Sequence, residues 1–143
     1  MTTITRDQMD RLIDGHFQAE AAGDIDAIVD GFVPGAQHDV VGRPGGPIYG
    51  DRQIADFYRG LLDDLSNLRF QKVRRRYGTN HAIDESILHA TAAGSPFGMP
   101  GGGREVRVRI LHVFDFSDGL ILRENAWLDL ASLQEQLFER TAA

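Results

Sequence analysis

Apolar residues in the first half of the chain recur every three to four positions, the spacing of an amphipathic helix with one buried face. This pattern predicts a long helix over residues 7–22 and, after a Gly-Asp break, a shorter helix over 25–32. A short strand is expected over 36–41. A third helix is expected over 52–65, with Asp51 as its N-cap, and the Gly- and Pro-rich stretch before it is expected to be a loop.

The second half of the chain has the lengths and apolar content of long strands. A Ser-Asp-Gly sequence suits a tight turn between the last two strands, and a Gly-rich stretch at 94–103 predicts a second loop. Helices followed by a run of strands are typical of an α+β fold, in which the helices cover one face of a curved sheet. Such a sheet makes a cone whose open end can hold a small molecule. The strands are expected over 67–77, 82–92, 105–116 and 120–130, and a terminal helix over 131–140.

The composition fits one ordinary globular domain over residues 1–143, with 42% hydrophobic and 25% charged residues. The absence of cysteine excludes a disulfide framework, a cysteine-ligated metal and a cysteine nucleophile. A net charge of −6 disfavours nucleic acid as a partner, and the basic stretch 72–76 is expected to be a solvated strand edge. Because no apolar run suits a membrane helix or a signal peptide, we expect a cytoplasmic protein without a membrane partner.

Three separated segments carry a family resemblance: AAGDIDAIVDGF at 21–32, YGDRQIADFY at 49–58 and HVFDFSDGLILRENAWLD at 112–129. Their sequence and order resemble the NTF2-like superfamily, and within it the SnoaL-like polyketide cyclase and ketosteroid isomerase branches. The resemblance implies a cone of three N-terminal helices packed on a strongly curved, mostly antiparallel sheet. It also implies a homodimer. Because this fold supports several unrelated activities, the resemblance predicts the fold more sharply than the function.

The resemblance supplies only part of an isomerase site. The two oxyanion-hole donors of ketosteroid isomerases correspond to His16 and His112. The position of the general-base aspartate falls on Val40. A steroid isomerase mechanism therefore lacks its base, unless His38 or Asp39 replaces that aspartate.

Three further positions bear on related activities. Tyr58 corresponds to a supporting pocket tyrosine of the isomerase branch. In limonene-epoxide-hydrolase-like members, an aspartate on the last strand helps to activate water and is paired with an Arg-x-Asp sequence. Here the last-strand position is Ala126, and the earlier strand has no Arg-x-Asp, which disfavours that reaction. Asp129 lies near the position where SnoaL-like cyclases have a late aspartate, displaced by three residues.

Four histidines are candidates for acid–base chemistry: His38, His112 and His16, and, as the weakest, His89 on the strand face opposite Leu88. His38 shares a strand face with Val40, and a neutral imidazole can accept a proton near pH 7. His112 is isolated on an apolar strand face, where it needs either a structural hydrogen-bond partner or a cavity. His16 lies on the apolar face of the first helix, beside the expected position of Tyr58. For each, the structural alternative is a core histidine bonded to a neighbouring group.

Carboxylates on the strands provide a second set of candidates. Asp84 and Glu85 are neighbours on one strand, so only one of them can face the pocket, and the pattern does not decide which. A buried carboxylate beside a histidine would orient it. Asp129 is either catalytic or the cap of the terminal helix. Arg123 and Glu124 are expected to form a solvated pair, unless a bulge turns Glu124 inward.

Aromatic residues complete the expected pocket. Phe57, Phe114 and Trp127 are candidates for its walls, and Trp127 is also a candidate for a dimer contact. His38, His112 and one carboxylate would suffice for a metal site, but no HxH, HxxxH or HExxH spacing supports one. The glycine runs match no nucleotide-binding fingerprint, and no GxSxG elbow occurs. We therefore expect neither a metal nor a cofactor.

The leading hypothesis is a cofactor-independent enzyme that moves a proton on a small, largely apolar carbonyl compound, as in cyclisation, isomerisation or dehydration. His38 is the expected base. His112, with His16 and Tyr58, is expected to donate to the developing enolate oxygen. The alternatives are a non-catalytic module that binds a hydrophobic ligand or a protein partner, and an epoxide hydrolase.

Overall fold

The computed structural model describes residues 3–138, in which three helices precede the long strands and a fourth follows them, as predicted. The strands are β1 (Phe32–Val40), β2 (Ile48–Tyr49), β3 (Leu65–Gly78), β4 (His81–Ala92), β5 (Arg104–Ser117) and β6 (Leu120–Leu128). The helices are α1 (Arg6–Ala22), α2 (Ile25–Asp30), α3 (Gly50–Asp64) and α4 (Leu130–Phe138), with a 3-10 turn, η1 (Pro96–Gly98), before β5.

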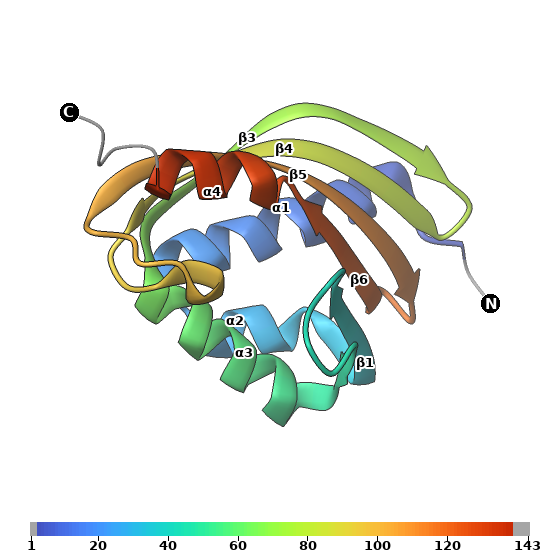
Figure 1. The fold of residues 1–143 in the computed structure, drawn as a ribbon. Helices are drawn as coiled ribbons and strands as arrows, with labels where there is room; N and C mark the ends of the chain where they lie inside the picture. Colours follow the sequence, from blue (N-terminus) through green and yellow to red (C-terminus); the bar gives the residue numbers. More distant parts are fainter. Residues whose placement is uncertain (1–2, 139–143) are drawn as a thin grey trace.

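The strands form one curved, unclosed sheet in the order β2-β1-β6-β5-β4-β3. β1 and β6 run parallel, and the other neighbouring strands are antiparallel. The sheet arches over α1, and α2 and α3 lie below that helix (Figure 1). α4 covers another part of the same sheet face, where Leu133 packs with Val106 and Val108. This architecture confirms the predicted α+β cone.

The first helix shows how local sequence sets the arrangement. The Thr5 hydroxyl accepts a hydrogen bond from the Gln8 amide, and the Gln8 side chain accepts one from the Thr5 amide. This reciprocal cap satisfies two backbone donors at the helix start. The apolar periodicity then buries Ile13 and Phe17 toward the sheet, and it carries His16 into the same interior.

β1 begins earlier than the sequence pattern predicted. α2 ends at Asp30, and the strand starts at Phe32. Pro34-Gly35, between the predicted helix over 25–32 and the predicted strand over 36–41, lies inside the observed strand, where the pairing with β6 shifts register between Phe32 and Gln37. Gly35 has a φ of +74° there. Such an irregularity accommodates a proline that lacks the N–H of a regular ladder.

Two helix starts also differ from prediction by a small amount. α3 begins at Gly50, so Asp51 lies in its first turn and is not the N-cap. An acidic residue in the first turn is still favourable because of the helix dipole. α4 begins at Leu130, and residues 139–140 of the predicted terminal helix lie outside the described residues.

Two apolar clusters share the concave face of the sheet. One includes Ile13, Ile54 and Phe114 beneath the first three helices, and the other includes Leu88 and Leu133 beneath α4. Polar side chains from α1, α3, β1, β5 and β6 meet at the boundary between these clusters. No helix within residues 3–138 is both long and apolar enough to cross a membrane.

Candidate active site

Glu124 faces the interior because the pairing between β5 and β6 is irregular. Arg123 pairs with Asp115, and Ile121 pairs with the next residue of β5, which leaves Leu122 as an extra residue. An extra residue reverses the alternation of side chains along a strand. Leu122 and Arg123 are therefore both exposed, and Glu124 is 2% exposed. The expected solvated pair of Arg123 and Glu124 is wrong, and the bulge alternative is confirmed.

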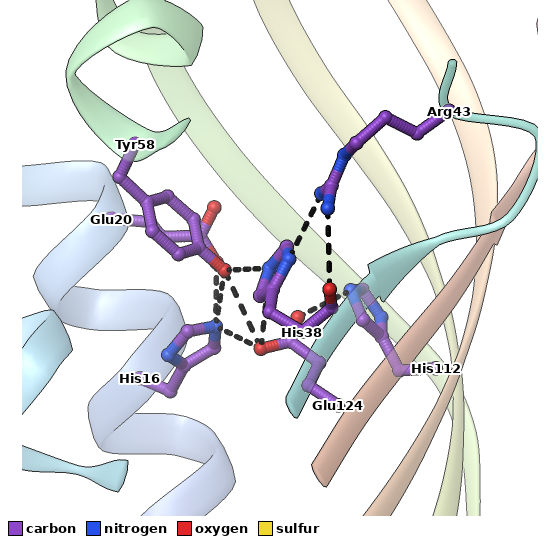
Figure 2. A network of polar contacts seen from close by, with 7 residues as sticks. All are labelled: His16, Glu20, His38, Arg43, Tyr58, His112 and Glu124. Atoms are coloured by element: carbon purple, nitrogen blue, oxygen red, sulfur yellow. Dashed lines mark hydrogen bonds and ion pairs between the residues drawn. The ribbon is translucent and has the colours of Figure 1, made fainter. Parts of the chain in front are cut away.

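Glu124 lies at the centre of a buried polar cluster (Figure 2). One carboxylate oxygen, Oε1, is 3.0 Å from His16 Nε2 and 3.4 Å from the Tyr58 hydroxyl. The other oxygen, Oε2, is 3.6 Å from His112 Nε2. The Nε2 of His38 lies 3.9 Å from Oε1. One carboxylate thus connects side chains from α1, α3, β1 and β5.

His16 lies between two buried carboxylates and carries a positive charge. Its Nε2 is 3.0 Å from Glu124 and 3.0 Å from Glu20, one turn further along α1. Burial alone would lower the pKa of His16, but the attraction of the two carboxylates outweighs it and raises the pKa to about 10. Burial alone would likewise raise the pKa of Glu124, yet the His16 charge holds it well below its usual range. Burial raises the pKa of Glu20.

His38 is held as one neutral tautomer. An Arg43 guanidinium nitrogen lies 3.0 Å from His38 Nδ1, and a guanidinium can only donate, so Nδ1 must accept. The proton therefore resides on Nε2, which donates to the Tyr58 hydroxyl oxygen at 2.9 Å. Burial, with a smaller effect of the Arg43 charge, lowers the pKa of His38 to about 4. Burial also raises the pKa of Tyr58, which remains a phenol at neutral pH.

His112 is neutral and has one ring nitrogen without a hydrogen bond. The ring stacks on Phe114 with a centroid distance of 5.4 Å, and it lies 5.1 Å from the ring of Phe17. Burial lowers the pKa of His112 despite the nearby Glu124. The Nδ1 atom is buried and has no hydrogen-bond partner among the described residues. With its Nε2 directed at Glu124, His112 can keep a free lone pair on Nδ1.

A narrow, mostly apolar cavity of about 40 Å³ opens beside this cluster. Its volume exceeds what one water molecule requires, so it is a cavity and not a packing void. His112, His38, Tyr58, Glu20 and Glu124 form its polar wall. The apolar wall consists of Val40, Phe57, Leu61, Leu65, Phe70, Leu88, Phe97, Ile110, Ala126 and Leu128.

Asp84 faces the interior, but its oxygens are already bonded. It is fully buried, and Arg75 Nε donates to it at 2.9 Å, as does the Ser86 hydroxyl. Asp84 pairs with His112 across β4 and β5, yet it does not line the cavity. Phe114 does not line it either, because this ring is buried in the apolar core behind His112.

Three further predicted site residues lie away from the cavity. Glu85 alternates to the outer face of the sheet, where it forms ion pairs with Arg74 and Arg109. Trp127 is on the same outer face and is 43% exposed, so the prediction of a pocket wall is wrong for it. Asp129 accepts a hydrogen bond from the backbone of α4 and caps that helix.

The sequence pattern missed two members of the site. Glu20 lies one helical turn after His16 on the buried face of α1, and this spacing was a signal that the two side chains meet. Arg43 had no such signal, because its position over His38 depends on the path of the loop that follows β1. No cluster of three or more histidine, aspartate or glutamate side chains in the described part of the chain has the geometry of a metal site.

Comparison with known proteins identifies the family to which this chain belongs. The sequence model of the SnoaL-like domain matches residues 13–124. The chain therefore belongs to the SnoaL-like family of the NTF2-like superfamily, which confirms the resemblance seen in the sequence. A comparison with curated proteins finds no match.

Solved structures share the fold at low sequence identity. TsrD from Streptomyces laurentii is 19% identical with a TM-score of 0.82, and the alignment covers 94% of this chain and 98% of that protein. A protein assigned to the SnoaL-like polyketide cyclases, from Jannaschia sp. CCS1, is 18% identical with a TM-score of 0.78, covering 92% and 89%. An epoxide hydrolase of M. tuberculosis, described as LEH-like, is 16% identical with a TM-score of 0.73, covering 93% and 91%. These likenesses establish the fold alone.

Proposed function

We propose that this protein is an enzyme that transfers a proton on a small, largely apolar carbonyl compound. The observation that carries the proposal is one cavity wall with two complementary groups. Both residues line the cavity: His112 is a neutral imidazole whose Nδ1 is buried and unbonded in the free protein, and Tyr58 is a phenol that stays protonated. Proton abstraction next to a carbonyl needs a base and a hydrogen-bond donor in one site, and this pair supplies both.

His112 is the general base in this mechanism. Its Nδ1 removes a proton from the carbon next to the substrate carbonyl, and the ring becomes an imidazolium. Glu124, whose Oε2 lies 3.6 Å from the opposite ring nitrogen, stabilises that charge and fixes the ring orientation. The low pKa of His112 keeps the ring in the basic form at neutral pH. His38 was the expected base, but both of its ring nitrogens are engaged.

Tyr58 is the donor to the developing enolate oxygen. His38 donates a hydrogen bond to the Tyr58 hydroxyl, and this polarisation strengthens the donation of Tyr58 to a third group. In the free protein the Tyr58 proton is directed at Glu124 over a long 3.4 Å contact, which a substrate oxygen can replace. His16 holds Glu124 in place and keeps it ionised, and Glu20 holds His16 from the other side. The proton returns from His112 to a different atom, which gives cyclisation, isomerisation or dehydration.

Two related observations support a carbonyl substrate. The apolar walls, with Phe57 and Phe70 among them, suit a hydrophobic carbon skeleton. Fold neighbours include proteins assigned as polyketide cyclases, whose name implies polyketone substrates. An epoxide hydrolase is less well supported, because the two aspartates that could activate water, Asp84 and Asp129, are bonded elsewhere.

Hydrogen–deuterium exchange at carbon tests the proposal. Methyl 4-oxo-4-phenylbutanoate, an uncharged ketone with acidic α-protons, is incubated with the protein in deuterated buffer, and the loss of α-protons is followed by NMR. We expect protein-dependent exchange that falls about 10²- to 10⁴-fold in His112→Asn. His89→Asn, a histidine variant on the outer sheet face, is the matched control and should exchange at the wild-type rate.

The opposite result has a definite meaning. If no exchange depends on the protein, or if His112→Asn keeps the full rate, proton transfer by this pair is wrong. Binding of the ketone without exchange would then favour the alternative of a non-catalytic module for a hydrophobic ligand.

We also propose that the outer face of the sheet joins two copies of this chain. Trp127 lies opposite Leu111 across β5 and β6. Leu122 on β6 and Ile83 on β4 are further exposed apolar residues. A face of this kind suits a symmetric contact in which the same patch serves both subunits.

A further inference from the structure

Arg43 is not part of the cavity lining, but it contacts three residues that are. Its guanidinium donates to the backbone carbonyl of His38 at 3.2 Å and to the Nδ1 of the same residue at 3.0 Å. The guanidinium carbon lies 4.5 Å from the ring centre of Phe57. The Arg43 amide donates to the Val40 carbonyl at 2.9 Å. His38, Val40 and Phe57 all form part of the cavity wall.

The turn that places Arg43 depends on a glycine directly before it. Gly42 has a φ of +95°, a conformation that residues with a side chain rarely adopt. The chain reverses there, so that the Arg43 amide reaches back to Val40 and its side chain lies over His38. The position of Arg43 is thus built into the loop.

Arg43 has N–H donors without an acceptor, and it forms no ion pair with a carboxylate of the described residues. Its guanidinium is half-buried, yet no Asp or Glu of the described residues lies within ion-pair distance of it. By contrast, the buried Arg75 forms ion pairs with three carboxylates, and the exposed Arg59 forms one with Asp56. The N–H groups of Arg43 that do not reach His38 have no acceptor among the described residues. Asp39 attracts the Arg43 charge from beyond ion-pair distance, but it does not bond the free N–H groups. A half-buried guanidinium with free donors is suited to bind an anion.

We propose that Arg43 binds a carboxylate of the substrate at the rim of the cavity, so that the substrate is a keto acid with an apolar body. The carbonyl part of this proposal rests on the proposed function, and the carboxylate part rests on Arg43. A planar guanidinium can bind a carboxylate with two parallel hydrogen bonds, which gives orientation as well as affinity.

The charges of the site also fix the direction in which such a molecule enters. Glu124 is ionised on the polar wall of the cavity and repels a second carboxylate from there. Arg43 attracts one at the rim. The keto group and its apolar neighbours therefore reach His112 and Tyr58, and the acid group stays outside beside Phe57.

Calorimetric titration with 4-oxo-4-phenylbutanoate and its methyl ester tests the role of Arg43. The two probes share the ketone and the phenyl ring and differ in charge. At neutral pH and low salt, we expect the wild-type protein to bind the acid about 10- to 100-fold more tightly than the ester, as for a hydrogen bond to a charged group. Arg43→Gln should remove this preference, because it should weaken binding of the acid far more than binding of the ester. Arg43→Lys, which keeps the charge but not the two-pronged donor, should keep part of it.

Arg59→Gln is the matched control, because it removes one positive charge from an exposed position on α3. It should keep the full preference for the acid. The preference should also shrink as salt is added, because the guanidinium is only half-buried.

Other outcomes overturn the assignment of Arg43. The assignment is wrong if the wild-type protein binds the acid no more tightly than the ester, or if it binds neither probe. It is also wrong if Arg43→Gln weakens acid and ester equally, since Arg43 would then act only by positioning His38. These binding results are independent of carbon exchange. A wild-type protein that exchanges the α-protons but does not prefer the acid rejects the carboxylate, and a wild-type protein that prefers the acid but does not exchange rejects the proposed reaction.

Discussion

Two buried polar networks tie α1 to the sheet, and they differ in how completely their atoms are bonded. In the first, Arg75 on β3 donates to Asp10 and Asp14 of α1 and to Asp84 of β4, at 2.8, 2.8 and 2.9 Å. Asp84 accepts a further hydrogen bond from Ser86. This Arg75 network has a donor for each buried acceptor and borders no cavity wall, which is the pattern of a structural network.

The second network, around Glu124, is incomplete. Nδ1 of His16 and Nδ1 of His112 are buried without a hydrogen bond among the described residues. The cluster also borders the apolar cavity. Asp84 and His112 pair across neighbouring strands, so the two networks lie side by side on one sheet. The difference teaches that burial and charge do not by themselves mark a site; unbonded polar atoms beside a cavity do.

The largest expected effect is the loss of the Arg75 network. Arg75→Met leaves Asp84 fully buried without its cation, and such a broken pair costs about 3–5 kcal/mol of unfolding free energy. Urea unfolding measures this loss. Arg59→Met, which breaks an exposed pair on α3, should change the unfolding free energy by less than about 1 kcal/mol. Equal effects of the two variants would show that the Arg75 network is not structural.

The second expected effect is a stability maximum near pH 6.5, set by the Glu124 network. The folded protein holds a proton on His16 up to about pH 10, whereas an unfolded histidine releases it near 6.5. Stability from His16 is therefore full below pH 6.5 and is lost as the pH rises toward 10. The raised pKa of Glu20 acts in the same direction. The pKa of His38 is about 4 in the folded protein, so between pH 4 and 6.5 only the unfolded chain binds a proton at this residue. Stability therefore falls as the pH is lowered from 6.5 to 4.

Thermal unfolding across this pH range measures both slopes. The melting temperature should fall by several degrees from pH 7 to 9.5, and His16→Gln should flatten this alkaline slope. His38→Gln should flatten the acid slope and leave the alkaline slope in place. A melting temperature that does not change on the alkaline side would contradict a charged His16.

The contrast between the two networks also shows what sequence can predict. Helical periodicity, the turns and the family segments predicted the cone, because each depends on nearby residues. Glu124 was different, since its inward direction depends on one extra residue in the pairing of β6 with β5. Side chains alternate with period two, so a single insertion exchanges the two faces of a strand.

The choice between Asp84 and Glu85 had a similar cause. The pattern of β4 is apolar on both faces, because its outer face carries Ile83 and Ile87. Only the partner Arg75, on another strand, shows which carboxylate is inside. Arg43 lay beyond any periodic pattern, since the loop path and the tertiary contact with His38 place it. Residues with local causes were predictable, and residues with partners far along the chain were not.

A third, smaller effect has the opposite sign to the Arg75 variant. His112→Leu replaces a ring with an unbonded buried nitrogen by an apolar side chain of similar size. Removing an unsatisfied polar atom should raise the unfolding free energy by about 1 kcal/mol, while carbon exchange is lost. His112→Asn keeps a polar group and shortens the side chain, so it should lower stability. If His112→Leu is as destabilising as Arg75→Met, His112 belongs to a structural network after all.

The smallest expected effect on the site comes from a residue outside both networks. Trp127 lies on the outer sheet face, 43% exposed, and contacts neither the Arg75 network nor the Glu124 cluster. Trp127→Lys should keep the exchange rate within about twofold, because distant sites are nearly independent. The same variant should convert a dimer into a monomer in sedimentation equilibrium, because a symmetric contact would place the new lysine charges of both subunits close together, where they repel. A wild-type chain that sediments as a monomer would reject the proposed dimer. A large loss of carbon exchange in Trp127→Lys would show instead that the outer face and the cavity are coupled through β6.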